Sequence, residues 1–139
     1  MQEEETLIIF KPDCMAERRI GEILRRFEEI GLELRAGKVM TLSSTLIDEH
    51  YAHVSHLPIF GSIKEFMGSR AVLVAILRGE NAVERVRRLL GPTDSMAALP
   101  GTIRGDYGTD KTRNAVHASD SVENARIEID RFFSSEEIF

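Results

Sequence analysis

The sequence predicts an α+β sandwich of the ferredoxin-like type, with elements in the order β-α-β-β-α-β and helices covering one face of an antiparallel sheet. Two observations lead to this prediction. Amphipathic segments of helical period, residues 20–30 and 82–90, alternate with short apolar runs typical of buried strands, residues 6–10 and 71–77. In addition, 139 residues with 42% hydrophobic and 29% charged side chains correspond to one ordinary globular domain, expected to span residues 1–139.

The N-terminal third is predicted to form a strand, a helix and a second strand. Residues 6–10 are apolar and partly β-branched and stop before Pro12, as a buried strand does. Residues 20–30 place apolar side chains at helical spacing, with charged residues on the opposite face. Residues 32–42 alternate between apolar and polar side chains, which predicts a strand with one solvated face and a bulge at Gly37.

The remainder of the chain is predicted to be mainly helical around one central strand. Cap-type residues precede a short helix over residues 46–53, and a second helix is expected over residues 60–67. The continuous apolar run of residues 71–77 is typical of a central strand. Amphipathic spacing then predicts helices over residues 82–90 and 122–133.

Residues 114–121 set a lone imidazole among small side chains directly before a helix start. Ala115 and Val116 are typical of the end of a short strand, and Asp120 and Glu123 are spaced as a capping box. His117 is therefore expected at a strand-to-helix junction, where free backbone N–H groups favour anions. An approachable imidazole at such a site indicates phosphoryl transfer, although this segment alone leaves open a surface histidine in a turn.

Residues 91–113 show neither helical nor strand periodicity, although they are rich in glycine and proline. A compact domain seldom keeps so long an excursion loop without a role in binding or assembly. The loop leads directly into the histidine segment. Lys11, Arg87, Arg104 and Asn114 are candidate donors to phosphate oxygens, because phosphoryl transfer needs cations and N–H groups around the transferred group.

Composition excludes several classes of protein. The formal net charge of −5 and the 6% aromatic content argue against specific nucleic-acid binding, while binding of a small effector without catalysis stays open. No apolar run approaches the roughly 20 residues that span a bilayer, so no membrane association is expected. Residues 1–5 are expected to be a solvated acidic tail, unlike a signal peptide. Cys14 is the single cysteine, in agreement with a cytoplasmic location.

Three histidines, His50, His53 and His56, recur at intervals of three and suggest a metal site at first sight. This interval does not line one helix face, and Pro58 follows closely. No carboxylate with metal-ligand spacing accompanies them, so no protein metal site is predicted.

Five short segments occur in a characteristic order and spacing: Lys11-Pro-Asp13, Ile20-Gly-Glu-Ile23, Glu49-His-Tyr51, Pro100-Gly-Thr-Ile-Arg-Gly-Asp106 and Asn114-x-x-His117-x-Ser-Asp-Ser121. They are similar to motifs of the nucleoside diphosphate kinase family, and the resemblance runs essentially from end to end. It implies a ping-pong reaction that moves the γ-phosphate of a nucleoside triphosphate to a histidine and then to a nucleoside diphosphate. Such a reaction maintains the nucleoside triphosphate pool.

The same resemblance implies the roles of individual residues. His117 corresponds to the nucleophile, phosphorylated on its pros nitrogen, although the sequence itself leaves open which ring nitrogen reacts. Glu128 and Ser119 are expected to orient the imidazole by fixing its tautomer. Contacts to phosphate and sugar are expected from six side chains: Lys11, Tyr51, Arg87, Thr93, Arg104 and Asn114.

The resemblance also implies the partners of the chain and one departure from the family. The substrates are expected to be ATP and other nucleoside di- and triphosphates, with Mg²⁺ carried on their phosphates, and the chain is expected to form a homo-oligomer, a tetramer or a hexamer. Ile59 and Phe60 stand where the family usually has two phenylalanines, the first of which stacks on the base. Ile59 lacks a π-face, so weaker nucleotide binding is expected.

Overall fold

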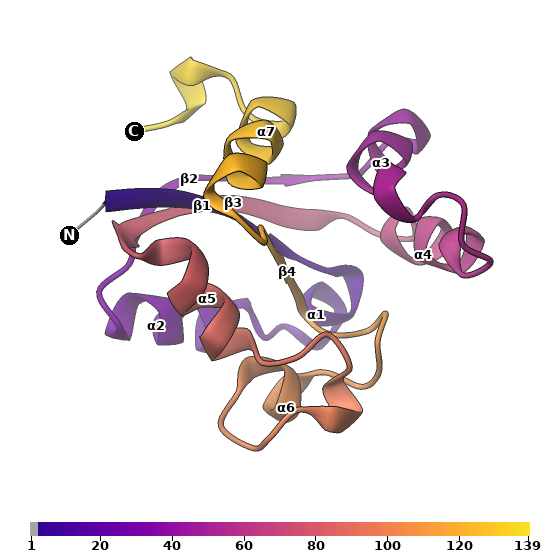
Figure 1. Cartoon of the computed structure of the whole chain (residues 1–139), viewed down its shortest axis with the longest axis horizontal. Helices are drawn as coiled ribbons and strands as arrows, with labels where there is room; N and C mark the ends of the chain where they lie inside the picture. The colour runs from indigo at the N-terminus through magenta and orange to yellow at the C-terminus, as the bar shows by residue number, and fades with distance from the viewer. Residues whose placement is uncertain (1–2) are drawn as a thin grey trace.

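The computed structural model describes residues 3–139 as a four-stranded antiparallel sheet flanked by helices (Figure 1). The strands are β1 (Glu3–Phe10), β2 (Glu33–Met40), β3 (Val72–Glu80) and β4 (Val116–Ala118). Their order in the sheet is β2-β3-β1-β4, and β1 pairs antiparallel with both β3 and β4. The predicted ferredoxin-like antiparallel sheet is thus confirmed.

Seven α-helices and three 3₁₀ turns complete residues 3–139: α1 (Pro12–Glu17), α2 (Ile20–Glu29), α3 (Ser44–His50), α4 (Phe60–Met67), α5 (Ala82–Leu90), α6 (Ile103–Tyr107), α7 (Val122–Phe132), η1 (Ala52–Val54), η2 (Ser95–Ala97) and η3 (Ser135–Glu137). The helices predicted from amphipathic spacing are confirmed to within one residue, whereas the predicted helix over residues 46–53 divides into α3 and η1. Helices α1 and α6 were not predicted, because five or six residues are too few for a periodic signal. No helix within residues 3–139 is long and apolar enough to cross a bilayer.

Helices cover both faces of the sheet, so the expectation of helices on one face is wrong (Figure 1). Residues 7–10 of β1 are all fully buried and alternate between two separate cores. One core packs Phe27 of α2 and Val86 of α5, and the other packs Ile129 and Phe132 of α7. A strand that is apolar on both faces must be covered on both, because each large buried side chain contributes about 1.5–3 kcal/mol.

Two predictions about the strands, the start of β1 and the position of the bulge in β2, need correction. Strand β1 begins at Glu3, so Glu3, Glu4 and Glu5 pair with β3 instead of forming a solvated tail, while residues 1–2 lie outside the described part of the chain. In β2 the register shifts between Leu34 and Ala36, so the irregularity is not at the predicted Gly37. Backbone pairing partners decide both features, and neither leaves a signal in local composition.

His117 lies in the middle of β4, opposite Ile9 of β1, and not at a strand-to-helix junction. The flanking residues of this strand are buried, so strand alternation turns the imidazole to the opposite face, toward α7. Ala115 directly precedes β4 with a left-handed φ of 70°, and its N–H donates to Oδ2 of Asp13 at 3.0 Å. The Asp13 carboxylate therefore helps to hold the turn that places His117.

The first turn of α7 is capped by Ser121 and not by the predicted pair of Asp120 and Glu123. The Ser121 Oγ accepts a hydrogen bond from the backbone N–H of Asn124 at 3.0 Å. The Asp120 carboxylate accepts from the side chain of Asn124 and lies outside the helix. A serine hydroxyl and an aspartate carboxylate are almost equally good caps, so the sequence could not select between adjacent positions.

Candidate active site

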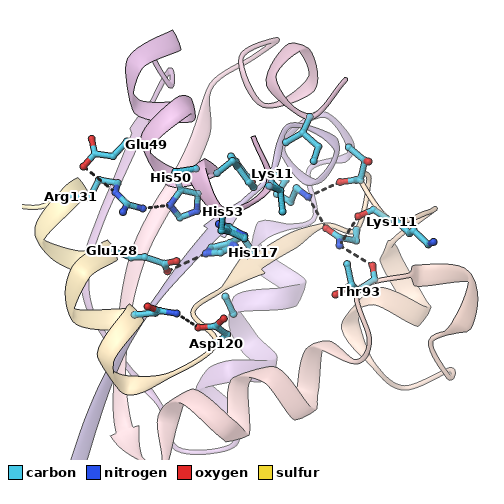
Figure 2. A pocket seen from close by; sticks show the side chains of 18 of the residues that line it. Lys11, Glu49, His50, His53, Thr93, Lys111, His117, Asp120, Glu128 and Arg131 are labelled. Carbon is cyan, nitrogen blue, oxygen red and sulfur yellow. Dashed lines mark hydrogen bonds and ion pairs between the residues drawn. The ribbon is translucent and has the colours of Figure 1, made fainter. Parts of the chain in front are cut away.

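A cavity of about 630 Å³ opens over the end of the sheet where β4, α3 and α7 meet the loop after α5 (Figure 2). Eight of the sequence-predicted site residues line it: Lys11, Tyr51, Arg87, Thr93, Arg104, Asn114, His117 and Glu128. Ser119 is fully buried beneath the wall. Ile59, with 43% of its surface exposed, and Phe60 lie at the start of α4 and do not line this cavity.

The His117 ring is held by one carboxylate. Its Nε2 lies 3.2 Å from Oε1 of Glu128, and Ser119 Oγ donates to the same oxygen at 2.6 Å. Burial opposes ionisation of Glu128, but hydrogen bonds from His117 and Ser119 and the charge of His117 lower its pKa to about 2. An ionised carboxylate only accepts hydrogen bonds, so a neutral His117 carries its proton on Nε2 and presents a lone pair at Nδ1.

Lys11, at the end of β1, is buried in the cavity wall. Its Nζ donates to Oδ1 of Asn114 at 2.8 Å and to the carbonyl oxygen of Thr112 at 2.6 Å. Burial lowers the pKa of Lys11 to about 8, and Arg104 adds to the effect, while Asp13 and Asp110 oppose it. A buried ammonium group is thus held among neutral acceptors.

Arg104 of α6 and Arg87 of α5 add two guanidinium groups to the wall. Arg104 donates to the carbonyl oxygens of Gly91 at 3.2 Å and Val116 at 2.8 Å, while Arg87 donates to that of Ala118 at 3.5 Å. Burial and repulsion from Arg87 lower the pKa of Arg104 to about 10. None of the ion pairs within residues 3–139 includes these two arginines or the wall lysine, so the wall favours anions.

Asn114 links three segments that are distant in sequence. Its Oδ1 accepts from Lys11, and its Nδ2 donates to the carbonyl oxygens of Thr93 at 2.9 Å and Lys111 at 3.1 Å. One buried amide therefore joins the end of β1 to both ends of the loop between α5 and β4. This explains how the excursion loop, which has no periodicity of its own, is held against the sheet.

Sequence reasoning missed two residues of this site, His50 and Arg131. The ring of His50 is buried and packs edge-on against that of His117, with ring centroids 4.6 Å apart and planes at 76°. Arg131 Nη1 lies 2.8 Å from Nδ1 of His50 (Figure 2). His50 belongs to the motif Glu49-His-Tyr51, which could have indicated it as a site residue. Arg131 is indicated only by its position three residues after Glu128, on the same face of a helix.

Within residues 3–139, one group of histidine, cysteine and acidic side chains converges as metal ligands do: His50, His117 and Glu128 offer ligand atoms within 4.8 Å of one another. His53 and His56, which share the interval of three with His50, do not join it. Mg²⁺ prefers six oxygen ligands, and this group offers one carboxylate that already accepts two hydrogen bonds. These side chains do not fit Mg²⁺ without oxygen ligands from a bound nucleotide.

Comparison with known proteins identifies the family. The family model described as "Nucleoside diphosphate kinase" matches residues 4–138. The chain is 46% identical over 136 residues to nucleoside diphosphate kinase from Parabacteroides distasonis, covering 98% of this chain and 89% of that protein. With the same enzyme from Staphylothermus marinus it shares 46% identity over 138 residues, which is 99% of this chain and 98% of the relative.

Solved structures agree with this result. A crystal structure of Aquifex aeolicus nucleoside diphosphate kinase matches with a TM-score of 0.96 at 44% identity, over 99% of this chain and all of that one (100%). The enzyme from Halobacterium salinarum, solved in complex with CDP, matches with a TM-score of 0.96 at 38% identity, covering 99% of this chain and 92% of that one. The chain therefore belongs to the nucleoside diphosphate kinase family.

Proposed function

We propose that this chain transfers the γ-phosphate of a nucleoside triphosphate to a nucleoside diphosphate by a ping-pong mechanism through phosphohistidine on His117. Family membership makes the chain a phosphotransferase, and the proposal adds the mechanism and the residues that perform it. The reaction serves to maintain the nucleoside triphosphate pool.

One observation carries the proposal. The imidazole of His117, 22% exposed, faces a cavity whose wall holds Lys11, Arg87 and Arg104, none of them in an ion pair within residues 3–139. Three cations without carboxylate partners stabilise the negative oxygens of a transferring phosphoryl group. Phosphoryl transfer also needs a nucleophile, and His117, with Nε2 bonded to Glu128 and a lone pair on Nδ1, provides one.

In the first half-reaction the lone pair on Nδ1 of His117 attacks the γ-phosphorus. The N–P bond forms as the P–O bond to the β-phosphate breaks, and the nucleoside diphosphate leaves with that oxygen and the bonding electron pair. The ring becomes cationic as it gains the phosphoryl group, and its Nε2 proton remains bonded to Glu128, 3.2 Å away. Ser119 holds the carboxylate from the other side.

In the second half-reaction a terminal oxygen of a bound nucleoside diphosphate attacks the phosphorus of phosphohistidine, and the N–P electron pair returns to Nδ1. The same cations stabilise charge in both directions, because donor and acceptor phosphates occupy one site. We propose Mg²⁺ as the cofactor, bound to the nucleotide phosphates, where it neutralises charge on their oxygens.

The remaining contacts are proposed from chemistry and position. Burial raises the pKa of Tyr51, so its hydroxyl stays protonated as a donor, and Thr93 supplies a second hydroxyl in the cavity wall. Asn114 keeps the lysine in place. We assign Ile59 and Phe60 to the base, which would reach beyond the cavity wall toward the start of α4. That the H. salinarum relative was solved with CDP supports nucleoside diphosphates as substrates.

Exposed apolar side chains support assembly into a homo-oligomer. Leu34 and Val39 are exposed on β2, the edge strand of the sheet, and Met96 and Leu99 are exposed on the excursion loop. Exposed apolar side chains at a sheet edge and on a prominent loop are typical of surfaces that bury against another chain. We propose a tetramer or a hexamer, and a cytoplasmic location remains a prediction from composition.

Labelling with [γ-³²P]ATP tests the proposal. The protein should become labelled, lose the label in acid, retain it in base, and pass it to added nucleoside diphosphates of any base. His117→Ala should abolish labelling, whereas His56→Ala, a change at an exposed histidine outside the cavity, should leave it intact. Nucleotide binding without label in the wild type, or label that persists in His117→Ala, would reject the mechanism and favour effector binding without catalysis.

A further inference from the structure

We propose that Arg131 is a positioning residue that holds the buried imidazole of His50 in one tautomer, with its proton on Nε2, and so keeps an uncharged ring in fixed contact with His117. Its kinetic consequence rests on the proposed role of His117 as nucleophile. The tautomer itself depends only on the contacts between α3 and α7.

The contact that sets the tautomer joins the last turns of two helices. Nη1 of Arg131, on α7, lies 2.8 Å from Nδ1 of His50, on α3. The arginine side chain is 13% exposed, and its Nε lies 3.4 Å from Oε1 of Glu49. A guanidinium group donates hydrogen bonds and cannot accept them, so Nδ1 of His50 must be the acceptor. The proton of the neutral ring is then on Nε2.

The surroundings keep this ring neutral. Burial lowers the pKa of His50 to about 3, and the charges of His117, Arg131 and His53 act in the same direction, while Glu128 opposes them. These are the titratable and charged groups that face His50 from β4, α7 and η1. A single uncharged tautomer is therefore expected throughout the pH range in which the enzyme works.

The position of the ring explains why its tautomer matters. His50 packs edge-on against His117 and against Phe132, whose ring centroid is 5.3 Å away, so it forms one wall of the nucleophile's site. A charged or reoriented His50 would compete with His117 for the carboxylate of Glu128, the one acidic group in residues 3–139 that is hydrogen-bonded to His117. Burial keeps His50 uncharged and the contact with Arg131 holds the ring in place, so the Glu128 carboxylate is left to His117.

The hydrogen bond between Arg131 and His50 should also prevent His50, His117 and Glu128 from binding a transition metal ion. His50, His117 and Glu128 offer ligand atoms within 4.8 Å of one another, and two histidines with one glutamate are a ligand set that zinc uses. Nδ1 of His50 faces Arg131, however, and Nε2, which is buried without a hydrogen-bond partner, carries the proton in the proposed tautomer, so neither nitrogen offers a lone pair to a metal ion. Without the arginine donor the proton can move to Nδ1, which leaves a lone pair on Nε2. The Arg131→Met variant should then bind Zn²⁺.

Nuclear magnetic resonance of ¹⁵N-histidine-labelled protein tests the tautomer directly. Long-range ¹H–¹⁵N correlations of His50 should show only the Nε2–H form in the wild type between pH 5 and 8. Arg131→Met, similar in length but without a donor, should give mixed tautomers. Arg131→Lys should restore the Nε2–H form, and the exposed Arg126→Met on the same helix should match the wild type. An Nδ1–H ring in the wild type, or an unchanged ring in Arg131→Met, would overturn the proposal.

Two further measurements separate positioning from substrate binding. Arg131→Met should lower kcat by roughly tenfold, with KM for nucleoside diphosphate changed less than twofold. Calorimetry without nucleotide should detect Zn²⁺ binding to this variant and not to the wild type. A raised KM with unchanged kcat, or equal Zn²⁺ binding by both proteins, contradicts the role given to Arg131. If the wild type never forms phosphohistidine, the proposed function fails, but the tautomer result stands.

Discussion

Replacing Glu128 by glutamine removes the charge that we propose stabilises His117 as it accepts the phosphoryl group. The change preserves shape, and the amide oxygen can still accept from Ser119. What is lost is the negative charge 3.2 Å from Nε2 of His117. In the transition state the imidazole becomes cationic, so the loss should affect the chemical step more than nucleotide binding.

The size of the effect follows from the contacts of the carboxylate. Its pKa, lowered from 4.5 to about 2, corresponds to about 3 kcal/mol of preference for the charged form, to which His117, Ser119 and His50 contribute against the cost of burial. The side chain is 13% exposed, so solvent screens this interaction little. A hydrogen bond to a charged group contributes about 1.5–3 kcal/mol. A loss of about 2 kcal/mol lowers the rate constant roughly 30-fold.

Rapid-quench measurement of phosphohistidine formation in a single turnover gives this rate constant. Glu128→Gln should be roughly 30-fold slower than the wild type, with KM for ATP changed less than about twofold. Glu123→Gln, the same change at an exposed position in the first turn of α7, should react at the wild-type rate. A rate within threefold of the wild type, or a loss confined to KM, would refute the role assigned to Glu128.

Three further predictions concern Lys11, His50 and Ile59. Because burial lowers the pKa of Lys11 to about 8, the free enzyme loses this charge as the pH rises, and kcat/KM should fall by up to tenfold per pH unit above 8. Lys11→Arg should remove this alkaline limb from the pH profile. Because the folded-state pKa of His50, about 3, lies below its ordinary 6.5, folding favours the neutral ring. Its contribution to stability is present above pH 6.5 and decreases as the pH falls from 6.5 toward 3, with a slope approaching about 1.4 kcal/mol per pH unit. Urea denaturation at a series of pH values should show that the stability of His50→Leu decreases less with falling pH than that of the wild type. Ile59→Phe should tighten nucleoside diphosphate binding, measured by calorimetry, because stacking on a base contributes about 1–3 kcal/mol.

Each of these predictions has an outcome that contradicts it. An alkaline limb that survives in Lys11→Arg would belong to another group. If His50→Leu has the same pH dependence of stability as the wild type between pH 6.5 and 4.5, His50 is not the group that titrates on unfolding. If Ile59→Phe leaves the dissociation constant unchanged, or if Leu57→Phe on the same exposed loop tightens it equally, Ile59 does not contact the base.

Much of the site could be predicted from sequence because it occurs in short motifs. Lys11, Arg104, Asn114 and His117 stand at characteristic spacing, and the cavity brings all four together. The excursion loop was predicted to take part in binding or assembly. That the buried amide of Asn114 fixes this loop to the sheet was not predicted. Hydrogen bonds between Asn114 and backbone carbonyls 3 and 21 residues away depend on the path of the chain.

The sequence by itself determined the alternation of apolar segments and the antiparallel sheet, and it singled out His117 as the proposed nucleophile, because periodicity and motif spacing are local properties of a chain. Only the tertiary structure decided that His117 lies inside β4, that helices cover both faces, and that Arg131 meets His50 across 81 residues of sequence. Contacts of that kind arise from the packing of α3 against α7 over a shared sheet. The orientation of each side chain at such a junction depends on neighbours that no local pattern records.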